Sequence, residues 1–138
     1  MKDFSDNWAE KAKRLGYRSR ASFKLEQIEN KYKRISGSDL IFEFGSAPGG
    51  WSQIISKYMN KQSKCFSFDL LSMSEVKNIS FFQQDINSSE FNLIAEDYYN
   101  EGDLVLSDRS VNLSGINITD EEENKELNYS TINLSKKL

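Results

Sequence analysis

The feature that most constrains the fold is a short apolar run that ends in a glycine-rich turn. Residues 39–44 (DLIFEF) are apolar enough to form a strand buried on both faces. Residues 45–50 (GSAPGG) predict a tight loop, and residues 51–60 (WSQIISKYMN) predict the helix that follows it. A buried strand followed by a glycine loop and a helix is the basic unit of a parallel α/β sheet.

The rest of the chain repeats this alternation. Further strands are expected at residues 63–70, 78–85 and 103–108, and further helices at residues 7–14, 20–33 and 89–99. Candidate N-caps are Asn7 for the first helix and Ser19 or Ser22 for the second. Residues 109–120 predict a polar loop, and the tail from residue 121 is either a helix or frayed. The pattern predicts a single α/β domain over residues 1–138, with a mostly parallel sheet covered on both faces.

Composition narrows the chemistry. The sequence has no histidine, which excludes Ser-His-Asp and Cys-His catalysis and histidine-ligated zinc. Its single cysteine, Cys65, excludes an internal disulfide and a multi-cysteine metal site, so we expect no metal. Proton transfer is left to Lys, Asp, Glu or Tyr. With no apolar run long enough for a bilayer and no apolar signal segment, we expect a cytoplasmic protein without membrane partners.

The net charge of −3 conceals an uneven distribution. Residues 1–64 hold 13 lysines and arginines against 7 acidic residues, a net +6, whereas residues 65–138 hold 5 against 14, a net −9. A basic N-terminal half is typical of a face that binds a polyanion. Solvated helix faces explain the same charges equally well.

Acidic residues follow the predicted strands in the way that glycines follow the first one. Asp69 comes 24 residues after Gly45, at the distance where doubly wound folds hold ribose hydroxyls. Asp85 could meet the amine of an adenine, although a helix N-cap is the better reading of this residue alone. Asp108 ends the strand at 103–108. Because ligands of such sheets bind outside the carboxyl ends of the strands, these residues converge on one crevice.

Four segments together resemble the FtsJ/RrmJ family of ribosomal RNA 2′-O-methyltransferases. They are YRSRASFKLEQI at 17–28, FGSAPGGWSQ at 44–53, FDLL-M at 68–73 and LVLSD…NLSG from 104. The pairing of APGGWSQ with RSRA-FKL is specific. The resemblance implies a Rossmann-like fold that uses S-adenosylmethionine (SAM) to methylate a uridine ribose of 23S rRNA in the large ribosomal subunit.

The resemblance also implies roles for individual residues. The cofactor site would be formed by Gly45, Gly49, Trp51, Asp69, Asp85 and Asp108. The catalytic residues that match the family's Lys-Asp-Lys-Glu set are Lys24 and Asp108. Residues 1–36 would be a helical segment that faces the RNA, with phosphate contacts from Lys11, Lys13, Arg14, Arg18, Arg20 and Lys24. Tyr17 or Phe23 could stack a base.

The sequence departs from the family after Asp108. Arg109-Ser110-Val111 stand where the family has Met-Ala-Pro, and the family's second lysine and its glutamate find no match in the tail. We therefore expect a C-terminally truncated sheet without its last strands. We expect a monomer, with association through the exposed edge strand as the alternative. Alternative functions are a non-catalytic RNA-binding remnant and a related enzyme acting on tRNA or an mRNA cap.

Overall fold

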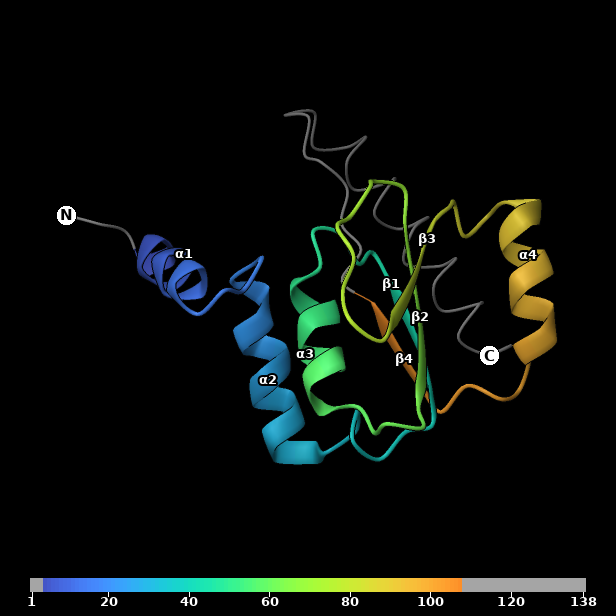
Figure 1. Cartoon of the computed structure of the whole chain (residues 1–138), viewed down its shortest axis with the longest axis horizontal. Coiled ribbons are helices and arrows are strands. Elements are labelled where there is room, and N and C mark those ends of the chain that lie inside the picture. Colours follow the sequence, from blue (N-terminus) through green and yellow to red (C-terminus); the bar gives the residue numbers. More distant parts are fainter. Residues whose placement is uncertain (1–3, 108–138) are drawn as a thin grey trace, which may run out of the picture.

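A computed structural model describes residues 4–107, and Figure 1 shows how the elements are arranged. The helices are α1 (Phe4–Arg14), α2 (Ala21–Tyr32), α3 (Gly50–Tyr58) and α4 (Ser89–Ala95), the last continued by the 3-10 helix η1 (Glu96–Tyr98). The strands are β1 (Leu40–Phe44), β2 (Lys64–Asp69), β3 (Ile79–Gln83) and β4 (Leu104–Ser107).

The described strands form one parallel sheet in the order β3-β2-β1-β4. The chain passes from β1 through α3 to β2, and later crosses by way of α4 from β3 to β4, on the other side of β1. The strand order therefore reverses beside β1. Open parallel sheets bind ligands at the carboxyl ends of the strands next to such a reversal. The loop at residues 45–50 leaves β1 at this position.

Helices cover both faces of the sheet, as the sequence predicted. On one face, Phe42 and Phe44 of β1 pack with Phe68 of β2 and Phe91 of α4. On the other face lies a cluster that joins the sheet to α2 and α3, formed by Leu25, Ile35, Ile41, Ile54, Ile55, Cys65, Val76 and Ile79. Figure 1 shows the sheet between these two layers. The central strand β1 is buried along its whole length, which explains why all its residues except Glu43 are apolar.

The predicted order of helices and strands within residues 4–107 is confirmed, whereas several predicted ends are wrong. Asn7 lies inside α1, which begins at Phe4, so it is no N-cap. Ser22 does not cap α2 either, because its hydroxyl donates to the Gly50 carbonyl. Ser19 is not the N-cap either, because that position is Arg20 and α2 has no side-chain cap, although Ser19 Oγ accepts the backbone N–H of Ala21 at 3.1 Å. The predicted helix at 89–99 is α-helical only to residue 95 and continues as the 3-10 helix η1 to residue 98. The predicted loop at 109–120 and the tail lie outside the described residues.

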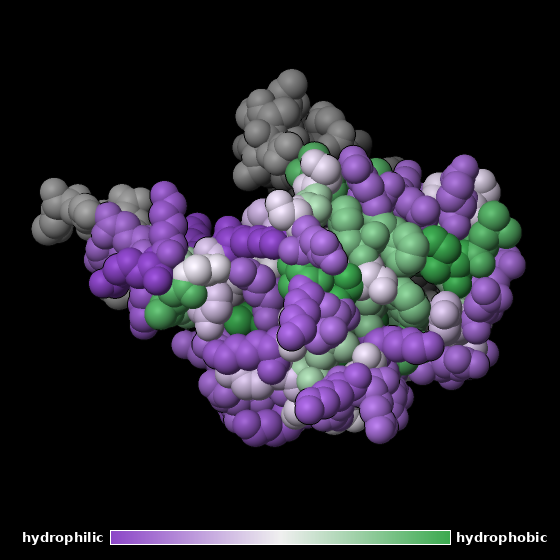
Figure 2. Space-filling model, in the orientation of Figure 1, coloured by the Kyte–Doolittle hydropathy of each residue, from purple (hydrophilic) through white to green (hydrophobic). Residues whose placement is uncertain are grey.

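The surface is uneven in polarity. Figure 2 shows hydrophilic residues over most of α1 and α2, at the left of that view. At the edge of the described sheet, Leu104, Val105 and Leu106 of β4 are half-buried. Within residues 4–107, no helix has the length and apolar character needed to cross a membrane. Over the same range, His, Cys, Asp and Glu side chains form no group of three that could hold a metal ion.

Candidate functional site

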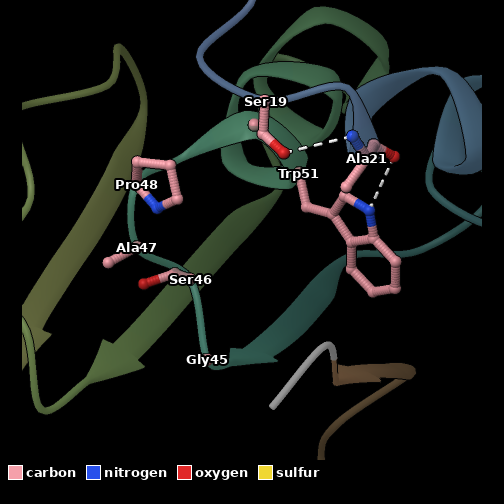
Figure 3. Close-up of a pocket in the computed structure, with 8 residues that line it drawn as sticks. Ser19, Ala21, Gly45, Ser46, Ala47, Pro48 and Trp51 are labelled. Atoms are coloured by element: carbon pink, nitrogen blue, oxygen red, sulfur yellow. Dashed lines mark hydrogen bonds between the residues drawn. The ribbon is translucent and has the colours of Figure 1, made fainter. Parts of the chain in front are cut away.

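A pocket lies where β1 passes into α3, between the loop and the start of α2. Its lining residues are Ser19, Ala21, Gly45, Ser46, Ala47, Pro48, Gly50 and Trp51. Figure 3 shows Ala21 and Trp51 on one side of it and Ala47 and Pro48 on the other. Gly45 (φ 76°) and Gly49 (φ 116°) both adopt the left-handed conformation that favours glycine. The glycine spacing of the motif thus shapes the loop that lines this pocket.

The start of α2 packs directly against the start of α3. The indole N–H of Trp51 donates to the Ala21 carbonyl at 3.0 Å (Figure 3), and Ser22 Oγ donates to the Gly50 carbonyl at 2.9 Å. A Cβ atom at Gly50 would come within 2.8 Å of both Ser19 Cβ and Ser22 Oγ. The two sequence motifs that carry the family resemblance therefore contact each other and together line one pocket.

A buried polar cluster lies next to the loop and connects the elements on either side of it. Glu43 of β1 is only 1% exposed, and its Oε1 accepts hydrogen bonds from Ser52 Oγ at 2.5 Å and Ser67 Oγ at 2.6 Å. The cluster links β1 to β2 and to the first turn of α3. Because a buried carboxylate is costly unless it is hydrogen-bonded, this arrangement accounts for the two buried serines. The hydroxyl of Ser46, itself 3% exposed, has no hydrogen-bond partner among the described residues.

Asp69 is brought to the loop, as the motif spacing predicted. Its Oδ2 accepts the backbone N–H of Ala47 at 2.9 Å, and its Oδ1 accepts that of Leu71 at 2.9 Å. A carboxylate oxygen can accept two hydrogen bonds, so each oxygen retains one acceptor site when only residues 4–107 are considered. Leu70 and Leu71, directly after it, are 64% and 66% exposed. An acceptor and two exposed apolar side chains thus lie at the carboxyl end of β2.

Asp85 lies at the same end of the sheet, because the preceding residue, Gln84, donates its backbone N–H to the Asp69 carbonyl at 3.0 Å. The Asp85 side chain accepts the N–H of Asn87 at 2.9 Å. The reading of Asp85 as a helix N-cap is wrong. The N-cap of α4 is Ser88, whose hydroxyl accepts the N–H of Phe91.

Of the two predicted catalytic residues, the structure describes Lys24 but not Asp108. Lys24 has an exposed side chain on α2, one turn after the pocket residue Ala21, and is not itself part of the pocket lining. Asp108 lies outside the described residues. Ser107, the residue before it, is registered opposite Phe44 of β1. The structure thus describes the end of β4 beside the start of the loop, and the role of Asp108 stays a prediction.

The basic residues predicted to bind RNA fall into two groups. Lys11, Lys13, Arg14 and Arg20 are exposed on α1 and at the start of α2. The Lys11 ammonium also lies over the rings of Trp8 and Phe23, 5.1 Å and 5.4 Å from their centroids. Arg18 instead directs its guanidinium to backbone carbonyls of Pro48, Ser74 and Glu75. No sequence signal distinguished Arg18 from its basic neighbours.

Two further groups near the site have displaced pKa values. Burial, together with the smaller effect of the neighbouring Glu43 carboxylate, raises the pKa of the Cys65 thiol to about 12. The hydrogen bond from Lys57 holds the pKa of Glu26 below its ordinary value, and hydrogen bonds from Tyr58 and Tyr17 act in the same direction. The Glu26 group joins α2 to α3 behind the pocket, with Lys57 Nζ at 2.8 Å from Glu26 Oε2.

Sequence reasoning missed several residues that build the pocket. Ser19 lines it from the turn before α2, and Ala21 lines it from the first position of α2. Gln53 connects α3 to the turn before α2: its Oε1 accepts the N–H of Arg18 at 2.8 Å, and its Nε2 donates to the Gly16 carbonyl at 2.9 Å. The only signal in the sequence was that these residues lie within the two motifs. Membership of a motif does not distinguish a residue that packs from one that contacts a ligand.

Comparisons with known proteins agree with this geometry. The model of the FtsJ-like methyltransferase family matches residues 17–138. The chain is 37% identical to ribosomal RNA large subunit methyltransferase E of Francisella tularensis subsp. novicida over 96% of its own length and 68% of that protein's. The same enzyme of Marinobacter nauticus is 37% identical over 85% of this chain and 58% of its own length.

A solved structure points the same way. A crystal structure described as a ribosomal RNA methyltransferase from Plasmodium falciparum superposes with a TM-score of 0.65 and 31% identity, and the match covers 83% of this chain and 68% of that one. Its fold confirms the predicted Rossmann-like methyltransferase architecture. With the family model spanning both walls of the pocket, the chain belongs to the FtsJ-like methyltransferase family.

Proposed function

We propose that this chain uses S-adenosylmethionine to methylate the 2′-hydroxyl of a uridine ribose in 23S rRNA of the large ribosomal subunit. Its relatives carry the name ribosomal RNA large subunit methyltransferase E. The observation that carries the proposal is the contact of Asp69 Oδ2 with the Ala47 N–H at 2.9 Å. This contact joins the acidic strand end to the glycine loop, beside the reversal of strand order where such sheets bind ligands.

The residues present fit the chemistry of this cofactor. Its amino-acid end carries a carboxylate, and α3 begins at Gly50 without a side-chain cap, which suits an anionic group at the helix N-terminus. Its ribose offers two hydroxyl donors, and Asp69 keeps one acceptor site on each oxygen. Its adenine is apolar on both faces, and the exposed Leu70 and Leu71 stand next to Asp69. Asp85 adds an acceptor at the same end of the sheet.

The proposed cofactor site comprises Gly45, Gly49, Trp51, Asp69, Asp85 and Asp108. When bound there, S-adenosylmethionine supplies a methyl group on a sulfonium, so its transfer needs positioning more than activation. Gly45 and Gly49 give the loop its left-handed turns. The Trp51 indole, fixed by its hydrogen bond to the Ala21 carbonyl, would lie between the cofactor and α2.

The target ribose would enter from the α2 side. Lys24 projects from α2 one turn beyond Ala21, and positions three apart lie on the same side of a helix. Its positive charge would stabilise the negative charge that develops on the 2′-oxygen as the hydroxyl loses its proton. Asp108, which matches the family's catalytic aspartate, would complete the pair. The exposed cations of α1 would hold RNA phosphates in a salt-dependent manner.

The direct test is transfer of labelled methyl from S-adenosylmethionine to undermethylated large ribosomal subunits, followed by nucleoside analysis. We expect label in 2′-O-methyluridine of 23S rRNA, and none with Asp69→Ala. Transfer RNA and capped mRNA serve as parallel substrates. Label found only in transfer RNA or only in capped mRNA would show that the proposed rRNA substrate is wrong. If a folded chain transfers no label to any of the three RNAs, the proposed activity is refuted.

A further inference from the structure

We propose that Arg18 is a positioning residue of the cofactor pocket, in place of the RNA-phosphate contact that its basic neighbours suggest. Its guanidinium ties the loop after β1 to the segment after β2, residues 70–78. The loop lines the pocket, and the second segment, which follows Asp69 directly, approaches the loop where Met73 lies beside Gly49. The identity of the ligand rests on the proposed function, whereas the role of Arg18 in holding the two segments does not.

Three hydrogen bonds carry the inference. Arg18 Nη1 donates to the Pro48 carbonyl at 3.2 Å and to the Ser74 carbonyl at 2.7 Å, and Nη2 donates to the Glu75 carbonyl at 2.7 Å. Hydrogen bonds from a charged donor are stronger than neutral ones. The planar guanidinium presents several donors in a fixed fork, which lets one side chain reach two separate backbone segments at once.

The base of the Arg18 side chain is itself fixed. Its backbone N–H donates to Gln53 Oε1 at 2.8 Å, and Gln53 Nε2 returns a bond to the Gly16 carbonyl at 2.9 Å. The turn that carries Arg18 is therefore docked on α3 from both sides. A side chain that leaves a fixed turn loses less conformational freedom when it bonds to the loops, so it is well suited to hold them.

Gly49 provides the space that Arg18 occupies. A Cβ atom at Gly49 would lie 2.7 Å from Arg18 Nη1 and 3.1 Å from Met73 Sδ. The second of the adjacent glycines, Gly50, meets α2 in the same way. The absence of a side chain at Gly49 is thus explained by the approach of Arg18, in addition to its φ of 116°.

The start of the segment has its own support, because Gln83 Nε2 donates to the Leu70 carbonyl at 3.0 Å, and Arg18 holds its middle through the carbonyls of Ser74 and Glu75. Residues 70–76 form no helix or strand. Its far end is anchored independently, because Val76 is buried and Ser56 Oγ donates to the Lys77 carbonyl at 2.6 Å. Loss of the guanidinium should therefore loosen residues 72–75 first, and through them weaken the bond that Asp69 accepts from the Leu71 N–H.

The test compares Arg18→Ala and Arg18→Lys with Arg20→Ala, a matched control whose side chain is exposed two residues away. Amide hydrogen exchange is measured on the ligand-free full chain. With either Arg18 variant we expect faster exchange at residues 45–50 and 70–75 and unchanged exchange at residues 76–79. Arg20→Ala should leave all three ranges unchanged. Exchange like that of the wild type in Arg18→Lys overturns the proposal, because lysine keeps the charge and loses the fork.

Two binding measurements complete the test. We expect Arg18→Ala and Arg18→Lys to weaken S-adenosylmethionine binding about tenfold, because the pocket is no longer preorganised. The slope of log affinity against log salt for large-subunit rRNA should stay as in the wild type. Arg20→Ala should lower that slope by about 0.7–0.9 and leave cofactor affinity unchanged. An Arg18→Ala chain that changes only the salt slope is a phosphate-contact variant and overturns the proposal.

The outcomes separate this inference from the proposed function. If the wild-type chain fails to bind S-adenosylmethionine, the proposed function fails, and the exchange comparison still decides the role of Arg18. If Arg18→Ala does not fold, Arg18→Lys carries the same comparison.

Discussion

Ser22 Oγ donates a hydrogen bond to the Gly50 carbonyl at 2.9 Å, and a Cβ atom at Gly50 would lie 2.8 Å from the same oxygen. The first residue of α3 is thus a glycine because α2 approaches it closely. This contact holds the two walls of the pocket together, so its disruption should affect both stability and ligand binding.

Gly50→Ala should lower the free energy of unfolding by about 1–3 kcal/mol, because the new methyl group meets the packed Ser19 and Ser22. Helix propensity alone predicts the opposite sign, since alanine favours a helix over glycine. Urea unfolding measures the difference. Asn30→Ala, at an exposed position of α2, is the control and should be neutral or stabilising. A Gly50→Ala chain more stable than the wild type would refute the close packing.

Glu26→Gln should reduce stability by about 0.5–1.5 kcal/mol at pH 7, a value discounted because Lys57 is 53% exposed. The folded state holds the pKa of Glu26 below its ordinary value. Its contribution is therefore present above the unfolded pKa of about 4.3 and lost as the pH falls through the lower folded pKa.

The measurement is urea unfolding of wild type and Glu26→Gln between pH 7 and pH 3, provided that both chains remain folded in the absence of urea. The difference between them should shrink at the acidic end. Glu101→Gln, at an exposed position, should show little difference at either pH. A Glu26 effect that is equal at both ends of the range would contradict a charge-dependent bond.

Cys65 should be unreactive in the folded chain. Burial raises the pKa of its thiol to about 12, so little thiolate forms at pH 8, and only the thiolate is a good nucleophile. A chromogenic disulfide reagent at pH 8 should label it slowly in buffer and rapidly in denaturant. Rapid labelling of the folded chain would show that the cluster around Glu43 is open to solvent.

The cations of α1 should contribute to RNA affinity through charge alone. Lys13→Gln with Arg14→Gln should reduce the slope of log affinity against log salt for large-subunit rRNA by about 0.7–0.9 per residue. Lys11 is left in place because it packs over Trp8. The matched control is Lys61→Gln with Lys64→Gln. Both lysines are exposed and lie at the amino end of β2, away from the carboxyl ends of the strands where the pocket lies. Equal effects of the two pairs would argue against an RNA-facing N-terminal segment.

Much of the fold could be predicted because it depends on local patterns. The apolar run of β1 and the glycine loop after it identified the parallel sheet, since they reflect burial on both faces and a required left-handed turn. The ends of helices were less predictable. Asn7 is a good capping residue, yet α1 extends past it to Phe4, and Ser88 rather than Asp85 caps α4.

The position of a site residue was predictable where it follows from the end of a strand, as for Asp69, whose contact with a ribose stays a prediction. It was not predictable where the role depends on contacts between distant segments. Arg18 has the same charge and a similar setting in the sequence as Arg20, and only the fold brings the carbonyls of Pro48 and Ser74 to it. The RNA-facing role of residues 1–36 stays a prediction.

The most direct test of the central claim is calorimetric titration of S-adenosylmethionine into the wild-type chain and into Asp69→Asn. Asparagine keeps the shape of Asp69 and one acceptor oxygen, but loses the charge and an acceptor for a ribose hydroxyl. The account predicts binding of one cofactor per wild-type chain, weakened about tenfold or more by Asp69→Asn and unchanged by the exposed control Asp97→Asn. No binding by a folded wild-type chain, or equal affinity in wild type and Asp69→Asn, would contradict it.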